Sequence, residues 1–519
     1  MSTPSLSALP EEIQVQILGY VYKYSLIDLR LISHTFARLI TPIIFRAIRV
    51  RAYRDEPQRF IDIAMTEHLR SHVREVTCDT WTGSCPMNKR RELTDKFFQA
   101  VPFISMFPRL DTLNIRLEHD RSHIDHNRQL GLLETLFHCL EGTWNMDDYV
   151  RRNTMSTPQP STCECYPQAQ TGIPLPIKTL TISNLIDVSG IKVLPAFQAV
   201  MNSGALKDLR ISVADGGDLD DLDDSEVITT TQKRSQDIHH DLLDIVLTPS
   251  IASNLQVLSL FSSTPWGWFP NMDFRLIGAN DLPNLKVLAL GHFEFSQWWQ
   301  VEWIGSLGIE KLYLDERTVL HSDHNRASII PDACCTICQD EASELSDKGY
   351  FAQRVEGNAW REGSTYHTHT RWRHIFEHWV NTMPNLRVFK IGQGWCLDDG
   401  AWKAIDPTYE GDFYEYVEED HGAIFQPFQD TSHQHFECPL PLTTGTGIRR
   451  YGSEAVQGYG AVFPYVEHIE GGGYTYTDSP GDGKEFLNVS LGEKEKDKNA
   501  FDKFLTVVET RRKGLAGQE

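Results

Sequence analysis

The sequence predicts an α/β fold, in which a short helical segment is followed by a long array of parallel strands with outer helices and long loop insertions. Two observations predict the array: an aliphatic template recurs through the middle of the chain, and amphipathic helical patterns fall between its copies. A third observation, a dense run of helix-forming residues in the first fifty positions, sets that segment apart.

Composition limits the classes of partner. The 519 residues include 49 basic and 71 acidic side chains, so the net charge is 49 − 71 = −22. This acidic excess argues against nucleic acid or an anionic membrane surface as the partner. No apolar run approaches the ~20 residues of a membrane helix. No signal segment is recognisable, so we expect the ten cysteines to be reduced thiols of an intracellular protein, in the cytoplasm or the nucleus.

The first helix is expected to begin at Pro10. Proline suits the first helical position, and the carboxylates of Glu11 and Glu12 favour the positive end of the helix dipole. The next apolar residues recur at helical spacing and predict one apolar face, made of Ile13, Ile17, Tyr20 and Val21.

A second helix is expected to begin near Ser25, because Ser25 and Asp28 have the spacing of a capping box. Pro42 predicts its end and the start of a short third helix. Leu18 and Leu31 lie off the predicted apolar faces, which leaves apolar side chains to spare for a partner. The apolar stripe of the second helix comprises Leu29, Ile32, Phe36, Leu39 and Ile40.

Three runs of residues, LPEEIQVQIL, LRLISHTFARL and PIIFRAIRV, resemble the F-box as fungal proteins carry it. The resemblance covers roughly residues 6–50 and predicts an F-box helical domain over residues 1–50. One departure is visible, since many F-boxes have an aspartate just before the second helix, where this chain has Ser25. The positions that match the motif are Leu9, Pro10, Ile13, Ile17, Leu29, Ile32 and Phe36.

The resemblance implies a function. F-box segments dock on the Skp-type adaptor of a cullin-RING ubiquitin ligase, and the rest of such a chain selects the protein substrate. The residues at the motif positions would either contact the adaptor or hold the helices together, and the sequence does not divide these two roles.

The template of the array is aliphatic-x-x-aliphatic-x-aliphatic. It occurs seven times, after a weaker first copy at Val73, Val76 and Cys78. From Leu180 to Phe389, successive central positions are 29, 49, 30, 24 and 77 residues apart. The copies are Leu110/Leu113/Ile115, Ile177/Leu180/Ile182, Leu206/Leu209/Ile211, Leu255/Leu258/Leu260, Leu285/Leu288/Leu290, Ile309/Leu312/Leu314 and Leu386/Phe389/Ile391.

The shorter spacings are typical of leucine-rich repeats, which run ~20–29 residues each, and the longer ones require insertions. The sequence therefore resembles an irregular leucine-rich-repeat-like solenoid over residues 51–392, with an ordinary α/β domain as the alternative. Helical patterns fall between the copies at residues 130–140, 238–247 and 372–383. Polar stretches at residues 142–176, 212–236 and 315–370 are expected to be loop insertions.

Residues 393–519 are expected to form an acidic, Gly- and Pro-rich extension that ends in a helix around Asn499–Arg511, preceded by the solvated charge run GEKEKDK. The acidic runs at residues 215–226 and 409–421 are either solubilising insertions or a docking site for a basic partner.

No catalytic motif is recognisable, since GxxxxGK[ST], HExxH and GxSxG are all absent, so we expect neither an enzyme nor a cofactor. Cys335 and Cys338 have the spacing of a zinc knuckle, and His374 and His378 are workable partners on a predicted helix. The 35 residues between Cys338 and His374 exceed the spacing of a compact finger. These four residues are therefore a weak metal candidate, with a satisfied surface pair as the alternative for the histidines.

Aromatic residues crowd into the 38 positions from Trp266 to Trp303 and either fill the core between helices and strands or form a recognition surface. They include Trp266, Trp268, Phe269, Phe293, Phe295, Trp298, Trp299 and Trp303.

We expect the protein substrate to bind the strand face that the helices leave open. The side chains on this face alternate with the buried aliphatics, and arginine and tyrosine often anchor interfaces. Arg116, Arg210 and Tyr313 are therefore the candidates, with Phe261 beside them; the alternative is that this face is solvated or covered by insertions. The predicted function is a substrate-recognition subunit of a Skp-cullin-F-box ubiquitin ligase, and a repeat-based binding scaffold without a ligase is the alternative.

Overall fold

The computed structural model describes residues 9–21, 23–80, 87–117, 126–145, 173–185, 195–213, 247–267, 274–315, 318–323, 366–367, 370–392, 465–468, 474–476 and 491–516. Within these ranges the chain is an α/β protein, as the sequence predicts. Its residues form two compact units, Met1–Ser183 with Gly190–Leu206 and Asn184–Ser189 with Lys207–Glu519, called here the first and the second unit. No helix in the described ranges has both the length and the apolarity to cross a bilayer.

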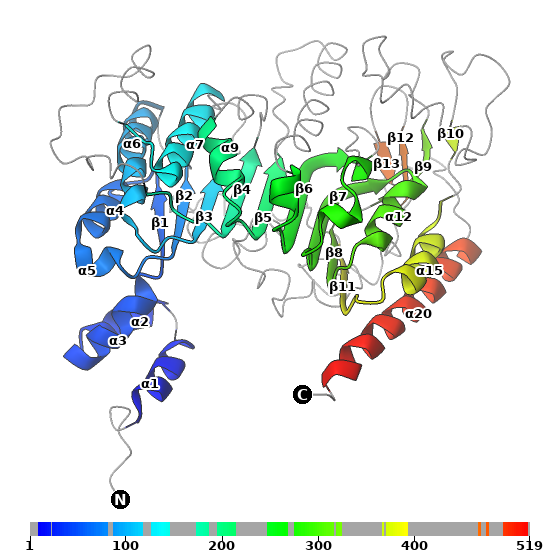
Figure 1. Ribbon diagram of the computed structural model, residues 1–519, viewed down its shortest axis with the longest axis horizontal. Coiled ribbons are helices and arrows are strands. Elements are labelled where there is room, and N and C mark those ends of the chain that lie inside the picture. The colour runs from blue at the N-terminus through cyan, green and yellow to red at the C-terminus, as the bar shows by residue number, and fades with distance from the viewer. Residues whose placement is uncertain are drawn as a thin grey trace, which may run out of the picture. The chain divides into compact units, whose positions relative to one another are not determined.

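The first unit begins with three short helices, α1 (Glu11–Leu18), α2 (Lys23–Arg30) and α3 (His34–Ile44) (Figure 1). The predicted start of α1 is confirmed, but the predicted boundaries of the next helix are wrong. Ser25 and Asp28 lie inside α2, and the residue that caps α3 is Ser33, whose Oγ accepts a hydrogen bond from the Phe36 amide at 3.2 Å. Pro42 lies inside α3, two residues before its end, and its missing N–H removes one hydrogen bond of the last helical turn.

Four parallel strands follow in chain order in the first unit: β1 (Ala47–Arg51), β2 (Glu75–Asp79), β3 (Thr112–Arg116) and β4 (Thr179–Leu185). Helical segments alternate with these strands. They are α4 (Glu56–Met65), α5 (Glu67–Arg70), α6 (Met87–Ala100), the 3₁₀ helix η2 (Val101–Met106), α7 (His126–Glu141) and α9 (Pro195–Met201).

The second unit contains five more parallel strands, paired in the order β5 (Asp208–Val213), β6 (Val257–Trp266), β7 (Val287–Phe295), β8 (Lys311–Asp315) and β11 (Val388–Gly392). The prediction of parallel strands is thus confirmed within each unit. The helical segments of the second unit are α11 (Pro249–Ala252), η5 (Phe274–Leu276), η6 (Ala279–Asp281), α12 (Trp298–Ser306), α15 (Trp372–Thr382) and α20 (Leu491–Ala516).

Two regions predicted to lack strands contain them. The insertion at 315–370 holds β9 (Thr318–Asp323) and β10 (Tyr366–His367), and the C-terminal extension holds β12 (Tyr465–His468) and β13 (Tyr474–Tyr476). β9 pairs in parallel with the end of β7 and with β12, whereas β10 and β13 pair antiparallel with β9 and β12. The acidic runs 215–226 and 409–421 lie outside the described residues.

A recurring backbone link joins consecutive strands at their starts. The carbonyl just before one strand accepts hydrogen bonds from two successive amides of the neighbouring strand, those of its preceding residue and its first residue, at 2.7–3.1 Å. In the described chain this arrangement occurs seven times, at the carbonyls of Arg46, Arg74, Asp111, Lys207, Gln256, Lys286 and Glu310. The repeat is therefore present in the backbone as well as in the side-chain template.

The aliphatic positions of the template form the core, as predicted. Every one of these side chains whose exposure the structure gives is between 0% and 7% exposed. Burial of each contributes ~1.5–3 kcal/mol of hydrophobic free energy. Aromatic rings add to this core in the first unit, where Phe60 packs against Phe107 at 5.3 Å between centroids and Phe137 packs against Phe197 at 4.7 Å.

Most of the crowded aromatic residues that the structure describes belong to the core of the second unit, whereas Trp298 and Trp299 are half-buried. Trp266, Phe293 and Phe295 are at most 1% exposed and Trp303 is 6% exposed. Buried indole nitrogens need acceptors, and Trp266 donates to the Gly291 carbonyl at 2.7 Å. Trp268 and Phe269 lie outside the described residues. Core packing is therefore confirmed for Trp266, Phe293, Phe295 and Trp303.

The C-terminal helix α20 packs beside α15, as Figure 1 shows in red and yellow. Phe376 of α15 lies between Phe501 and Phe504 of α20, at 5.2 and 5.5 Å between ring centroids. The predicted terminal helix is confirmed, but it begins earlier, at Leu491, and includes the charge run GEKEKDK. The prediction that this run is solvated is wrong for Asp497, which is 0% exposed.

α20 supplies hydrogen bonds to both ends of α15. At the start of α15, Asp497 Oδ1 accepts from the Arg373 amide at 3.0 Å, and Glu493 is ion-paired with the Arg373 side chain. At the end of α15, the Arg511 guanidinium donates to the carbonyls of Val380 at 2.8 Å and Met383 at 2.7 Å. Hydrogen bonds from Lys496 and Arg373 lower the pKa of Glu493 to about 2.

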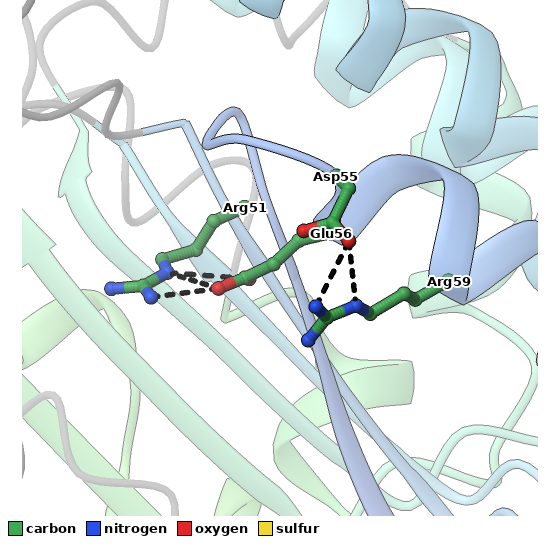
Figure 2. A network of polar contacts seen from close by, with 4 residues as sticks. All are labelled: Arg51, Asp55, Glu56 and Arg59. Atoms are coloured by element: carbon green, nitrogen blue, oxygen red, sulfur yellow. Dashed lines mark hydrogen bonds and ion pairs between the residues drawn. The ribbon is translucent and has the colours of Figure 1, made fainter.

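A polar network connects β1 to α4 (Figure 2). Arg51, the last residue of β1, is 1% exposed and donates through Nη2 to Glu56 Oε1 at 2.7 Å. One turn further along α4, Arg59 donates to Asp55 at 3.0 Å, but both of these side chains are more than 60% exposed. The two ion pairs are thus adjacent in space and differ strongly in burial.

The two cysteines that the structure describes, Cys78 and Cys139, are free thiols, as expected. Both are fully buried, and burial raises the pKa of each thiol well above its ordinary value.

Candidate functional site

The N-terminal helices share a small core of their own. Its buried members are Leu18, Leu26, Leu39, Ile40 and Ile44. Around them lie the half-buried side chains of Val21, Leu29, Phe36, Ile43 and Phe45. Helices this short are marginal by themselves, so this core is what holds them together.

Most apolar side chains of α1 and its surroundings lie outside this core. Among the described residues, ten large hydrophobic side chains are prominently exposed, and eight of them fall within residues 9–32. We call these eight the apolar patch. They are Leu9 (37%), Ile13 (42%), Val15 (41%), Ile17 (37%), Tyr20 (84%), Ile27 (45%), Leu31 (83%) and Ile32 (66%).

Three residues of the predicted apolar face, Ile13, Ile17 and Tyr20, are therefore exposed, whereas the fourth, Val21, packs against the helical core. The side chains that α1 buries are Gln14 and Leu18, and Leu18 lies off both predicted apolar faces. Most of α1 stays exposed because three short helices enclose few side chains. Leu18 is the apolar residue of α1 that packs into this small core. The expectation of spare apolar side chains is right for Leu31, and Val15 and Ile27 are further members that periodicity missed.

The structure divides the seven predicted adaptor-binding residues into two groups. Leu9, Pro10, Ile13, Ile17 and Ile32 are exposed. Leu29 and Phe36 are half-buried and pack against the helical core. The exposed group is available to a partner, and the second group supports the helices.

Two polar contacts fix α1 in place. Glu11 and Arg38 form a bidentate pair between α1 and α3, at 2.8 and 2.9 Å, and the hydrogen bond from Arg38 lowers the pKa of the Glu11 carboxyl. Gln14 Nε2 donates to the Leu9 carbonyl at 2.7 Å, which ties the residues before α1 to its buried side.

The predicted substrate-binding residues of the second unit are less accessible than expected. Arg210 is 1% exposed and forms a bidentate ion pair with Asp208 at 2.9 Å. Tyr313 is 2% exposed and belongs to a buried apolar cluster, against which Phe261 is packed. The expectation that Arg210 and Tyr313 lie on an open surface is wrong: the template fixes which strand face a side chain is on, but not whether that face is open.

The corresponding face in the first unit is polar. Arg116 is half-buried at the end of β3, next to Asp79 on β2 and Ser183 on β4. Two residues earlier on β3, Asn114 pairs in register with Thr77 on β2 and with Thr181 on β4. Asn114 Nδ2 donates to Glu75 Oε1 at 3.0 Å and to Thr77 Oγ1 at 3.3 Å.

The structure describes only two of the four candidate zinc ligands, His374 and His378. Cys335 and Cys338 lie outside the described residues. His378 packs edge-on against Trp298 at 5.2 Å between ring centroids, and burial lowers the pKa of His374. In the described part of the chain, no group of three or more His, Cys, Asp or Glu side chains is placed to hold a metal ion. The four-residue site stays a prediction.

The chain matches no protein-family model, and no curated protein matches it. What it does must therefore be inferred from its own residues and geometry.

Proposed function

We propose that this protein is the substrate-recognition subunit of a Skp-cullin-F-box ubiquitin ligase, in which the N-terminal helices dock on a Skp-type adaptor. The apolar patch carries the proposal. Monomeric proteins rarely expose a dense group of large apolar side chains, and such groups mark protein interfaces. Here eight of the ten prominently exposed hydrophobic side chains of the described residues lie within residues 9–32, the segment that resembles an F-box.

The division of roles within this segment supports docking. Leu18, Leu39 and Ile40 already form the core, so the exposed side chains of Ile13 and Ile17 are surplus to folding. Leu31, at 83% exposed, would gain hydrophobic free energy from being covered by a partner. A helical segment whose fold and binding surface use different residues can present that surface before the partner arrives.

The strand array would provide the substrate-binding part. Repeated strand–helix units give extended surfaces that suit protein recognition. Of the predicted substrate-binding residues, Arg116 in the first unit is the better candidate, because it is half-buried at the end of β3 whereas Arg210 and Tyr313 are buried in the second unit.

A scaffold that binds proteins without a ligase is the second candidate, and the same strand array supports it. The two functions differ in one requirement, which is adaptor binding through the apolar patch.

Co-expression of the full-length chain with a Skp-type adaptor tests the proposal. We expect a stable one-to-one complex on size-exclusion chromatography, and ubiquitin transfer to captured substrate when the cullin-RING core is added. A chain that elutes without the adaptor at micromolar concentration would leave the scaffold as the better account.

A further inference from the structure

The residue directly before a strand is usually basic in this protein. This position, called here the row position, precedes each of the nine parallel strands β1–β8 and β11. Lysine and arginine make up 49 of the 519 residues, so chance would place fewer than one of them at nine positions, yet six are present. The nine residues are Arg46, Arg74, Asp111 and Lys178 in the first unit and Lys207, Gln256, Lys286, Glu310 and Arg387 in the second.

The row positions of each unit are direct neighbours. Within a unit, the amide of each one donates to the carbonyl of the one before it, at 2.7–2.9 Å, from Arg46 to Lys178 and from Lys207 to Arg387. Neighbouring strands lie ~4.8 Å apart, so the first row is ~14 Å long and the second ~19 Å. Because the strands of a unit are parallel, each row follows the edge at which its strands begin.

Each row carries accessible positive charge. Arg74 Nη1 lies 3.7 Å from Asp111 Oδ2 in the first row, and Arg387 Nη1 lies 3.5 Å from Glu310 Oε2 in the second. The other four basic side chains are exposed and form no ion pair in the part of the chain that the structure describes; they are Arg46, Lys178, Lys207 and Lys286. With three bases and one acid, each row has a net charge of 3 − 1 = +2, in a chain whose net charge is −22.

Helix dipoles do not account for these basic residues. Helices between parallel strands run back toward the strand starts, so their negative carboxyl-terminal ends lie near the rows, where cations are favourable. This effect is confined to the last helical turn. The last turns of η2, α9, α12 and α15 contain no basic residue, and the basic row residues lie several positions beyond a helix end. The positive charge is thus placed toward solvent rather than against a helix.

The spacing of the charges indicates the class of ligand. A net charge of +2 over each row gives about one positive charge per 7–10 Å. A single nucleic-acid strand carries one negative charge per ~3.4 Å, which is two to three times denser. An extended polypeptide with an acid at every second residue carries one per ~6.8 Å, and wider spacings of acids extend this range. The rows therefore match an acidic protein segment.

We propose that the two rows bind acidic segments of a protein partner, which lie extended along the strand starts and direct Asp or Glu side chains at the exposed basic residues. The inference goes beyond the proposed function, because the rows use different residues from the apolar patch. It holds for a ligase subunit and for a scaffold alike.

Fluorescence anisotropy with defined peptides tests the inference on the full-length protein. The probe is a labelled peptide of about twenty-four residues that alternates Asp and Ser, and the matched peptide has Asn in place of every Asp. At low ionic strength we expect the Asp peptide to bind at least about tenfold more tightly than the Asn peptide. Raising the salt concentration from about 20 to about 200 mM should weaken this binding, because salt screens exposed charges.

Two variants of equal net charge locate the binding site. The row variant is Arg46→Gln/Lys178→Gln/Lys207→Gln/Lys286→Gln. The control variant removes four exposed basic residues elsewhere and is Arg59→Gln/Lys96→Gln/Lys498→Gln/Lys503→Gln. We expect the row variant to bind the Asp peptide at least about tenfold more weakly than the wild type and the control variant to stay within about threefold.

Three results would overturn the inference. The first is a wild type that binds the Asp and Asn peptides equally, or a row variant that binds the Asp peptide as tightly as the control variant does. The second is a row variant that melts more than about 5 °C below the control variant, which would show that the basic residues serve the fold. The third is tighter binding of an oligothymidine with the same number of charges as the Asp peptide, which would identify the partner as nucleic acid.

Discussion

Ile17 and Leu18 are consecutive residues of α1 and have opposite environments. Leu18 is 1% exposed within the core shared by the N-terminal helices, whereas Ile17 is 37% exposed and belongs to the apolar patch. The two side chains are similar in size and hydrophobicity, so only the arrangement of the helices determines which one is buried. This pair allows folding and binding to be tested separately.

Truncating the two residues should have unequal effects on stability. Leu18→Ala should destabilise the N-terminal helices by about 2–5 kcal/mol, because it leaves a cavity in a small core. Ile17→Ala should change stability by no more than about 0.5 kcal/mol, as surface substitutions do. Hydrogen exchange of the amides in residues 9–45 measures both effects, and equal loss of protection in the two variants would contradict this assignment.

The two neighbouring ion pairs of Figure 2 should also differ in strength. Glu56→Ala should cost about 1.5–3 kcal/mol, because it removes charged hydrogen bonds from the buried Arg51. Asp55→Ala, which removes the exposed partner of Arg59, should cost no more than about 1 kcal/mol. Urea unfolding curves of the two variants give the comparison, and a larger cost for Asp55→Ala would contradict it.

Removing an aromatic ring from α20 should release this helix from α15. Phe504 is 0% exposed and packs against Phe376 and Phe389, so Phe504→Ala should cost about 3–5 kcal/mol locally. The exposed Lys503 is the control, and Lys503→Ala should have little effect. Tryptophan fluorescence reports the result through Trp379, whose ring lies 6.3 Å from Phe504. An unchanged spectrum in Phe504→Ala would show that α20 does not pack there.

Low pH should weaken the contact between α20 and α15. The pKa of Glu493 is lowered from 4.5 to about 2 by its hydrogen bonds to Lys496 and Arg373. A lowered carboxyl pKa means that the contribution to stability is complete above the unfolded pKa and is lost as pH falls through the folded one. The contact should therefore weaken between about pH 4.5 and about pH 2. Glu493→Gln should flatten this part of the pH profile of Trp379 fluorescence, whereas Glu495→Gln should retain it.

Sequence patterns predict the fold better than they predict its surfaces. The template identifies buried strand positions such as Leu113 and Leu258, because alternation along a strand is a local property. The template does not predict the first strand, β1, since Ile48 and Val50 do not complete it. Asp497 is buried because it caps a helix 124 residues away, a contact that no local pattern encodes.

In the candidate sites, too, local patterns identify the residues but long-range packing determines which of them are exposed. Local motifs identify Leu9, Ile13 and Ile17 as residues of one segment, but separating them from Leu18 requires the packing of three helices. The template places Arg210 on the face opposite the core aliphatics. Whether that face is open depends on distant segments, and Arg210 is buried.

The affinity of the full-length protein for a Skp-type adaptor tests the central claim most directly. Isothermal titration should compare the wild type with Ile13→Asp/Ile17→Asp, which places two charges in the apolar patch, and with Met65→Asp, a similarly exposed position (50%) outside it. We expect the wild type to bind and the double variant to lose at least about 30-fold in affinity, the ~2 kcal/mol of an interface hot spot. Met65→Asp should stay within about twofold of the wild type. A wild type that does not bind the adaptor, or a double variant that binds as tightly as the wild type, would contradict the account.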